Sequence, residues 1–434
     1  MRLTILQLPL IVVLALGCRD AEPDVPSLDP LARRYTTLVL ALGEHDANYV
    51  DAYYGPDSLR LAVRAESLSI SQIRTAAESL IYILGDTEPA YDDSLLTLRH
   101  TYLRAQLVAM SARARIIDGE WLAFDEEAQL LYDVTPPHQT DEHFDSLLSR
   151  LDSLLPGRGT LSARYERFRT RVNIPSDRVD TVFKTAIAAC RARTLAHMQL
   201  PPGERFDLEY VTGTPWNAYN WYQGDFRSLI QVNLDFPIAI DRAVDLACHE
   251  GYPGHHVYNA KLEEKLVRER GWTEFAVYPL FSPQSLIAEG TANYGIEMAF
   301  PASERVAYER DSLFPLAGLD TSLAERNARV REIMEQLNYA RNEVARRYLD
   351  GDLDTASAVA AMRRYWLQSP EAAEKTVRFI DTYRSYVINY NLGRDLVRRH
   401  VEPASGASTE QRWTAFLALL STPRTAGSLG SDGR

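Results

Sequence analysis

Three of the nine histidines in this sequence lie within one stretch of eight residues. They are His249, His255 and His256, and Glu250 directly follows the first of them. Neutral imidazoles bind zinc, and a hydrolytic zinc site also needs a carboxylate that accepts a proton from water. A His-Glu pair on one helical turn supplies both a ligand and this proton acceptor. The stretch therefore predicts a zinc-dependent hydrolase, with Zn2+ as cofactor and Glu250 as general base.

The spacing of these histidines departs from a helical His-Glu-x-x-His motif. The fourth residue after His249 is Pro253, which cannot bind a metal ion and interrupts a helix. If Pro253 and Gly254 bulge out of the helix as an insertion, His255 becomes the second ligand. A continuous helix would instead place His256 on the face of His249, because seven residues make nearly two turns. The sequence favours His255 and leaves His256 as the alternative.

A third metal ligand is expected from a separate helix, predicted at about residues 284–300. Glu289 and Asn293 are four residues apart and share one face of this helix. Glu289 is the predicted third ligand. Asn293 is predicted to steady the site through a hydrogen bond, with direct metal binding as its alternative.

Helical periodicity dominates the sequence around these segments. Apolar residues recur every three or four positions in the stretches 34–50, 70–84, 94–117, 144–155, 179–198, 323–349, 355–367 and 371–390. Residues 206–211 and 228–234 alternate apolar and polar side chains and predict two strands of a hairpin-like insert. The expected fold class is therefore mainly α, with a small β hairpin or edge strand near the site.

Composition excludes several other classes of protein. Of the 434 residues, 46% are hydrophobic and 24% are charged, as in an ordinary globular protein. The net charge of −12 comes without basic clusters, so we expect no nucleic-acid partner. The three cysteines cannot form a disulfide scaffold or a thiolate metal cluster. The sequence carries no signal for its oligomeric state.

The first 18 residues have the pattern of a bacterial lipoprotein signal. Arg2 precedes an apolar stretch that ends in small residues before Cys18. A lipid on Cys18 would be the only membrane attachment, and Arg19 favours the outer membrane, facing the periplasm. A plain secretory signal is the alternative, and it also exports the protein. We expect a flexible tether at 19–30, one helical domain of one or two lobes at 31–420, and a disordered tail at 421–434.

The two chemical segments together resemble a bacterial family known as domain of unknown function eight-eight-five. The family's mark is His-Glu-x-x-Pro-Gly-His followed by Glu-Gly-x-Ala-x-Tyr, and these patterns stand here at 249–255 and 289–294. The resemblance covers roughly residues 201–400. It implies a helical fold like that of the gluzincin metallopeptidases and a peptide substrate.

The resemblance also extends to the C-terminal stretch 384–393. The family pattern Pro-Gly-Gln-x-x-Ser-Tyr-x-x-Gly is matched here only at Tyr390 and Gly393. A tyrosine hydroxyl can donate to the oxyanion of a tetrahedral intermediate, so Tyr390 is the candidate for that role, with a packed aromatic as the alternative. Tyr386 is a candidate substrate-binding residue.

Substrate binding is also expected from the strand that precedes the metal helix. In helical metallopeptidases an edge strand at this place pairs with the extended substrate backbone. Residues 228–234 are predicted to do so, with Gln231 and Asn233 contacting the substrate. The aromatic stretch 216–222 is expected to line side-chain subsites or to anchor a loop.

These observations predict a zinc peptidase of the cell envelope. Glu250 would take a proton from the attacking water and pass it to the leaving amine. A metal-dependent amidase or esterase is the nearest alternative, because the motif activates water and does not define the acyl group. A non-catalytic envelope binding or scaffold lipoprotein is the second alternative, and a structural zinc site is the third.

Overall fold

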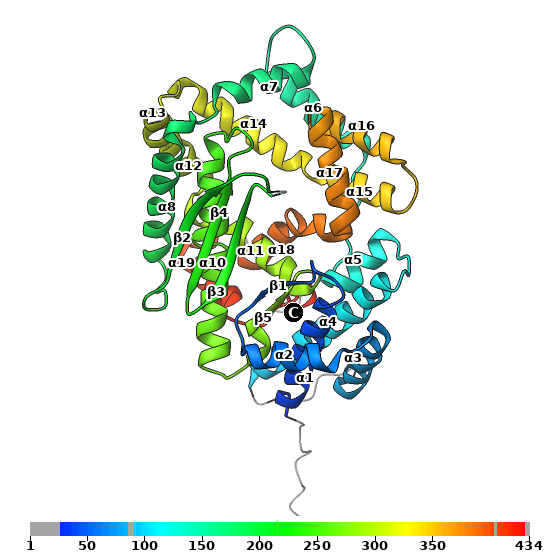
Figure 1. The fold of residues 1–434 in the computed structure, drawn as a ribbon. Helices are drawn as coiled ribbons and strands as arrows, with labels where there is room; N and C mark the ends of the chain where they lie inside the picture. The colour runs from blue at the N-terminus through cyan, green and yellow to red at the C-terminus, as the bar shows by residue number, and fades with distance from the viewer. Residues whose placement is uncertain (1–26, 86–90, 92, 215, 403–405, 430–434) are drawn as a thin grey trace, which may run out of the picture.

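The structure, a computed structural model, describes residues 27–85, 91, 93–214, 216–402 and 406–429. The predicted signal at 1–18, including Cys18, and most of the predicted tether lie outside the described residues. The described part of the chain is mainly helical, which confirms the predicted fold class (Figure 1). Its helices are α1 (Asp29–Gly43), α2 (Asp57–Glu66), α3 (Ile70–Leu84), α4 (Ser94–Ile117), α5 (Phe124–Tyr132), α6 (Asp141–Leu154), α7 (Leu161–Arg171), α8 (Val179–Leu195), α9 (Asp241–Leu246), α10 (His255–Leu262), α11 (Pro283–Ala299), α12 (Ala302–Tyr308), α13 (Phe314–Ala317), α14 (Ala324–Leu337), α15 (Tyr339–Leu349), α16 (Thr355–Tyr365), α17 (Pro370–Tyr383), α18 (Leu392–Val401), α19 (Thr409–Leu420) and α20 (Ala426–Leu429). Its strands are β1 (Val50–Tyr53), β2 (Arg205–Val211), β3 (Ala218–Gly224), β4 (Arg227–Asn233) and β5 (Val277–Pro279).

Apolar periodicity located several helices closely. The stretches predicted at 70–84 and 94–117 match α3 and α4, and Ser69 and Gln72 form a capping box that fixes the start of α3. The stretch at 323–349 is divided at Asn338 into α14 and α15. The stretch at 371–390 forms α17 and then tightens into a 3₁₀-helix, Arg384–Asn389. This change of helix type brings Tyr386 and Tyr390 toward α11.

The two ends of the described chain are better ordered than predicted. Leu28 is buried and α1 begins at Asp29, so the predicted tether ends earlier than residue 30. The predicted disordered tail is wrong for residues 421–429, where Ala426 and Leu429 are buried in α20. The Gly427 amide also donates a hydrogen bond of 2.9 Å to Asp133 Oδ2. Residues 430–434 lie outside the described residues.

The larger sheet has the strand order β2-β4-β3 and lies beside α8 and α10 (Figure 1). β4 pairs in parallel with β2 and antiparallel with β3. The predicted hairpin between 206–211 and 228–234 is therefore wrong in its pairing. The hairpin is formed by β3 and β4, because the Trp- and Tyr-rich residues 218–224 suit a pleated surface and form a strand of their own.

Helix α11 lies at the centre of the molecule and carries Glu289. It packs against the turn Ala247–Gly251, against α10, and against the 3₁₀-helix Arg384–Asn389. Its approach to α18 depends on two glycines, since a Cβ added to Gly290 would lie 2.5 Å from the Gly393 carbonyl oxygen. The close crossing fixes α11 beside the segment that carries Tyr386 and Tyr390.

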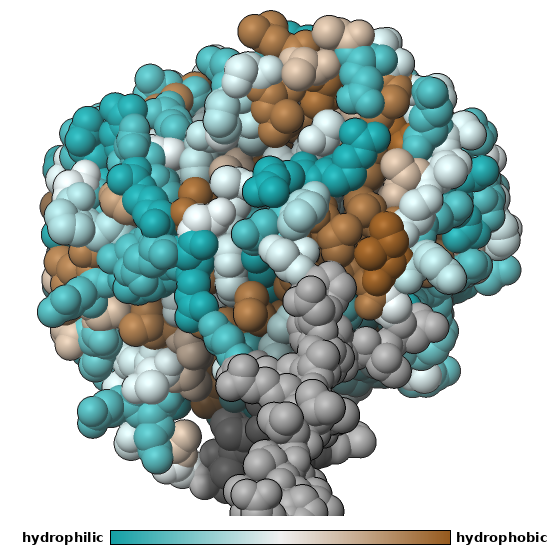
Figure 2. Space-filling view, turned by 90° about the horizontal axis from the view of Figure 1, so that it is seen from below, coloured by the Kyte–Doolittle hydropathy of each residue, from teal (hydrophilic) through white to brown (hydrophobic). Residues whose placement is uncertain are grey.

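Helices α1, α2 and α3 lie at the lower end of the molecule in Figure 1. Leu61 on α2 and Tyr82 and Ile83 on α3 are large exposed apolar side chains. Figure 2, which views this end, shows hydrophobic residues exposed among hydrophilic ones. Among the described residues, the helices are all too short or too polar to cross a membrane.

Candidate metal centre

The segment with the three histidines is a helix interrupted once. α9 continues into a π-helical turn, Ala247–Gly251, and α10 begins at His255 after a short break. A Cβ added to Gly254 would collide with the carbonyl oxygens of Cys248 and His249, so only glycine allows the chain to pass this close. The break turns the chain back toward His249 and places His255 next to it.

The structure brings His249, His255 and Glu289 together. The two Nε2 atoms lie 3.2 Å apart, and Glu289 Oε2 lies 3.4 Å from His249 Nε2. Glu289 Oε1 lies 3.8 Å from His255 Nε2. Ligand atoms about 2.0–2.1 Å from a tetrahedral zinc ion are separated by about 3.3 Å from one another. The spacing of the three side chains therefore suits one zinc ion.

The charges in this cluster also suit a metal ion. Burial, aided by the Arg242 charge, lowers the pKa of His249 to about 4. Burial and the neighbouring His249 hold the pKa of His255 well below its usual value, so both imidazoles are neutral, the form that binds metal. Burial raises the pKa of Glu289 to about 7, and its Oε2 atom is buried without a hydrogen-bond partner. A cation bound between these atoms would satisfy that oxygen.

A second layer of side chains holds these ligands in place. The Tyr386 hydroxyl donates a hydrogen bond of 2.8 Å to Glu289 Oε1. Asn293 lies close enough to His249 to act on its pKa, and its amide nitrogen donates to the Tyr390 carbonyl oxygen at 3.0 Å. Asn293 thus connects His249 to the C-terminal segment. Tyr386, predicted to bind substrate, has its hydroxyl committed to Glu289.

Glu250 is buried beside these residues, and only 6% of its surface is exposed. Its carbonyl oxygen accepts a hydrogen bond of 2.7 Å from Asn220 Nδ2 on β3. Its carboxylate has no hydrogen-bond partner in the described part of the chain, and burial, reinforced by the Glu289 charge, raises its pKa to about 8. The arrangement leaves a carboxyl group of high proton affinity free to face a substrate.

Tyr390 lies close enough to Glu289 and Glu250 for their charges to act on its hydroxyl. Burial, with the negative charges of Glu289 and Glu250, holds the pKa of its hydroxyl well above the usual value. The hydroxyl is therefore protonated and able to donate. The Arg341 guanidinium lies over the Tyr390 ring, 5.0 Å from its centroid.

Arg341 is a site residue that sequence reasoning missed. Its guanidinium has no ion-pair partner among the described residues, and its Nε atom is buried without a hydrogen bond. Burial lowers the pKa of Arg341. It lies on α15 among several arginines of the same helical stretch, so its sequence pattern carries no distinguishing signal.

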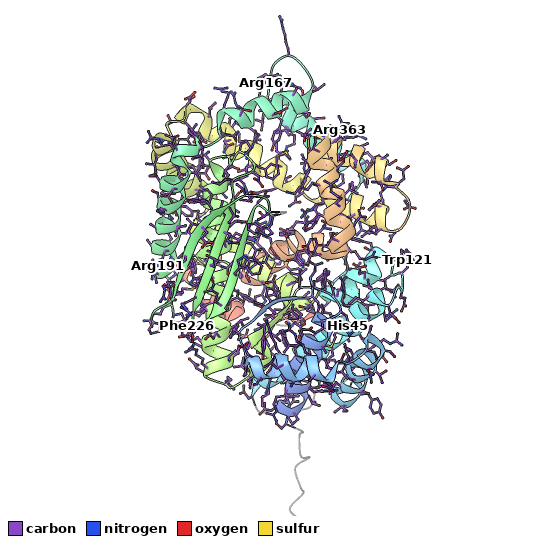
Figure 3. The ribbon with its side chains drawn as sticks, in the orientation of Figure 1. His45, Trp121, Arg167, Arg191, Phe226 and Arg363 are labelled. Atoms are coloured by element: carbon purple, nitrogen blue, oxygen red, sulfur yellow. The ribbon has the colours of Figure 1, made fainter. Side chains whose placement is uncertain are left out.

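His256 points away from the metal centre, which contradicts its role as the alternative ligand. It is fully buried, with Nδ1 2.9 Å from Ser228 Oγ and Nε2 3.0 Å from Glu204 Oε2. Glu204 also forms an ion pair with Arg191, which lies on the outer side of α8 (Figure 3). Adjacent residues on a helix point about 100° apart, so His255 and His256 cannot both face one ion.

The predicted roles of β4, Gln231 and Asn233 do not fit the structure. β4 is the central strand, and its backbone is paired on both sides, so it cannot accept a substrate strand. Gln231 links the Trp221 and Glu209 side chains of the two neighbouring strands. Asn233 is buried and donates to the Thr214 and Trp216 carbonyl oxygens. Gln231 thus joins the strands of the sheet, and Asn233 anchors the loop that precedes β3.

Comparison with known proteins shows a related fold at low sequence identity. A candidate lipoprotein from Colwellia psychrerythraea superposes with a TM-score of 0.53 at 15% identity, over 84% of this chain and 66% of that protein. This chain therefore spans slightly less than two thirds of that lipoprotein. An M32 carboxypeptidase from Deinococcus radiodurans R1 gives a TM-score of 0.45 at 13% identity, over 90% of each chain. A candidate lipoprotein of unknown function from Shewanella oneidensis gives 0.46 at 11% identity, over 86% of this chain and 75% of that one. No model of a protein family and no curated protein matches the sequence.

Proposed function

We propose that this protein is a zinc-dependent peptidase of the gluzincin type. One observation supports this proposal most strongly. The neutral imidazoles of His249 and His255 lie next to Glu289 Oε2, which has no hydrogen-bond partner among the described residues, and the carboxyl group of Glu250 lies beside them. His249, His255 and Glu289 would hold the ion. When bound, zinc supplies a Lewis acid that makes water nucleophilic near neutral pH and polarises a carbonyl group.

The remaining chemistry is assigned to side chains of this protein. In its ionised form, Glu250 takes a proton from the attacking water and delivers it to the leaving nitrogen of the peptide. The Tyr390 hydroxyl donates a hydrogen bond to the carbonyl oxygen as negative charge develops there. Tyr386 and Asn293 keep Glu289 and His249 oriented.

The peptide substrate is expected to bind along β3. β3 is an edge strand that pairs with β4 alone in its sheet, and its Asn220 contacts the Glu250 backbone. An extended peptide can add to such an edge through main-chain hydrogen bonds. This assignment replaces β4 with the neighbouring strand.

The cellular setting of this proposal rests on the sequence alone. The motif at 249–255 and the motif at 289–294 support membership of the domain-of-unknown-function family eight-eight-five. The N-terminal pattern that ends at Cys18 supports an exported lipoprotein, anchored by lipid and facing the periplasm. Peptides are its proposed partners, and nucleic acids are not.

Substitution of Glu250 by Gln tests the proposed function. Purified wild type and Glu250→Gln are compared for zinc content and for hydrolysis of a mixed peptide library, with ester substrates run in parallel. We expect about one zinc per chain in both proteins and cleavage of peptides by the wild type alone. Glu269→Gln, a change of an exposed carboxylate in the segment that follows α10, serves as the control and should cleave like the wild type.

Two outcomes would contradict the proposal. Equal peptide turnover by wild type and Glu250→Gln would exclude Glu250 as the general base. Absence of zinc from the wild type after dialysis against zinc would exclude the metal centre itself.

A further inference from the structure

Asp51 on β1 is another carboxylate that the fold brings toward the metal centre. β1 pairs with β5, and the register of the pair shifts between Val50 and Ala52, so Asp51 is the bulged residue. Bulges redirect a side chain out of the regular alternation of a strand and are frequent beside active sites. Asp51 Oδ1 accepts a hydrogen bond from the Tyr219 hydroxyl on β3. Tyr219 thus ties the bulge to the edge strand.

Asp51 has no cationic partner within the described residues. Burial raises its pKa to about 6, so the group is still mostly ionised at neutral pH, and the Tyr219 hydrogen bond favours the ionised form. The Asp51 side chain is partly buried, and a carboxylate that loses part of its contact with water without gaining a cation is destabilised.

The proposed metal ion does not remove this cost. The cluster of possible ligand atoms in the described part of the chain comprises His249, His255 and Glu289, and it does not include Asp51. The two arginines whose charges act on the site, Arg242 and Arg341, contact other residues. Arg242 forms an ion pair with Asp245, and Arg341 lies over Tyr390. A further cation next to Asp51 would therefore be stabilised by its charge.

Asp51 lies next to β3, the strand along which the peptide is proposed to bind. Tyr219, which holds Asp51, and Asn220, which contacts the backbone of Glu250, are neighbours on the edge strand β3. Successive side chains of a strand point to opposite faces, so Asp51 and the Glu250 backbone contact adjacent positions of β3 from different sides, and a peptide added to the β3 edge would run past both positions. The cation beside Asp51 can thus come from the substrate.

We propose that Asp51 binds a cationic group of the peptide substrate, with Tyr219 as the residue that positions its carboxylate. Two groups have this chemistry: the free α-ammonium group at the peptide N-terminus, and the cationic end of a lysine or arginine side chain. The inference deepens the proposed function and rests on it. It predicts that the enzyme prefers peptides that carry a positive charge near the cleaved bond.

Binding measurements test this assignment without reliance on turnover. The zinc-loaded Glu250→Gln protein is titrated calorimetrically with tetra-alanine, with its N-acetyl form, and with N-acetyl peptides that carry either lysine or norleucine at one position. The same titrations are made with Glu250→Gln/Asp51→Asn. Loss of one charge-assisted hydrogen bond is expected to weaken binding of the preferred cationic peptide by roughly 10- to 100-fold. Binding of its neutral counterpart should change less than about threefold.

The peptide set distinguishes the two sources of the cation. A preference for tetra-alanine over its N-acetyl form assigns Asp51 to the α-ammonium group, and a preference for lysine over norleucine assigns it to a side chain. Asp57→Asn, an exposed change on α2, is the matched control and should leave every affinity unaltered. Tyr219→Phe, which keeps the Asp51 charge but removes its donor, should reduce the preference in part and serves if Asp51→Asn fails to fold.

The outcomes separate this inference from the proposed function. If peptides bind and the wild type cleaves them but no variant alters a preference for charge, the role of Asp51 is refuted and the peptidase stands. If no peptide binds any variant and the wild type cleaves none, the proposed function and this inference fall together.

Discussion

His255 and His256 are adjacent histidines that the structure assigns to different tasks, and replacing each by alanine tests the assignment. His255 faces His249 and Glu289, whereas His256 is buried between Ser228 and Glu204. We predict that His255→Ala loses zinc and keeps most of its stability. His256→Ala is predicted to lose stability and to keep the three metal ligands.

The expected magnitudes follow from the contacts. His256→Ala removes two hydrogen bonds of 2.9 and 3.0 Å from a fully buried side chain. Glu204 keeps Tyr252 and Arg191 as partners, so the loss should stay near 3 kcal/mol, at about 1 kcal/mol per hydrogen bond plus a cavity term. His255 has one such contact, its Nε2 atom 3.2 Å from His249 Nε2, and its side chain is partly exposed, so its replacement should cost about 1 kcal/mol.

Two measurements test the roles assigned to His255 and His256. Urea unfolding with a chelator present gives the stability of each metal-free variant, and competition with a chromophoric chelator gives its zinc affinity. Loss of one of three ligands should lower zinc affinity by more than the roughly 10- to 100-fold typical of a change outside the ligand shell. The reasoning is refuted if His256→Ala loses zinc at unchanged stability, or if His255→Ala retains the wild-type zinc affinity.

Three further substitutions probe the surroundings of the metal centre. Tyr390→Phe should lower kcat by roughly 10²- to 10³-fold with little change in KM, measured by steady-state kinetics on the best peptide. Tyr386→Phe leaves Glu289 without its donor and should weaken zinc binding by about 10- to 100-fold, measured by chelator competition; unchanged affinity would exclude this orienting role. Gly290→Ala places a methyl group against the Gly393 carbonyl oxygen and should destabilise the protein by roughly 1–3 kcal/mol in urea unfolding, whereas Ala292→Gly, two residues along α11, should cost about 1 kcal/mol.

The elements that carry the metal ligands were predictable from local sequence. His249 and Glu250 at the end of one helix, and Glu289 on another, follow from periodicity and from the spacing of a few residues. The choice between His255 and His256 depended on Pro253 and Gly254, because these residues cannot continue a helix. The structure places His255 at the site for this reason.

The pairing of the strands was not predictable in the same way. Alternation in 206–211 and 228–234 indicates two strands but does not reveal which strands are neighbours. The residues between them contain Pro, Gly and several aromatics, which suit a loop as well as a strand. Once 218–224 forms β3, β4 becomes central, Gln231 joins the strands of the sheet and Asn233 anchors the loop that precedes β3. The error in substrate-binding residues is thus a consequence of the error in strand order.

Asp51 and Arg341 were not predicted from the sequence, because what distinguishes them is the absence of a charged partner in the described part of the folded protein. Only the folded structure shows that neither has an oppositely charged side chain as a partner among the described residues.

The electrostatic state of the site depends on burial, which residue types alone do not give. Burial raises the pKa of Glu250 to about 8 and of Glu289 to about 7, and it lowers the pKa of His249 to about 4. The histidines are therefore neutral, the raised pKa values of Glu250 and Glu289 show that the site disfavours their charged forms, and Asp51 with a pKa of about 6 is mostly ionised at neutral pH. Cations relieve the unfavourable energy of this arrangement. The fold therefore favours binding of a positively charged group at two places, Glu289 and Asp51. One would be the proposed metal ion at Glu289, and the other would be the proposed charged group of the substrate at Asp51.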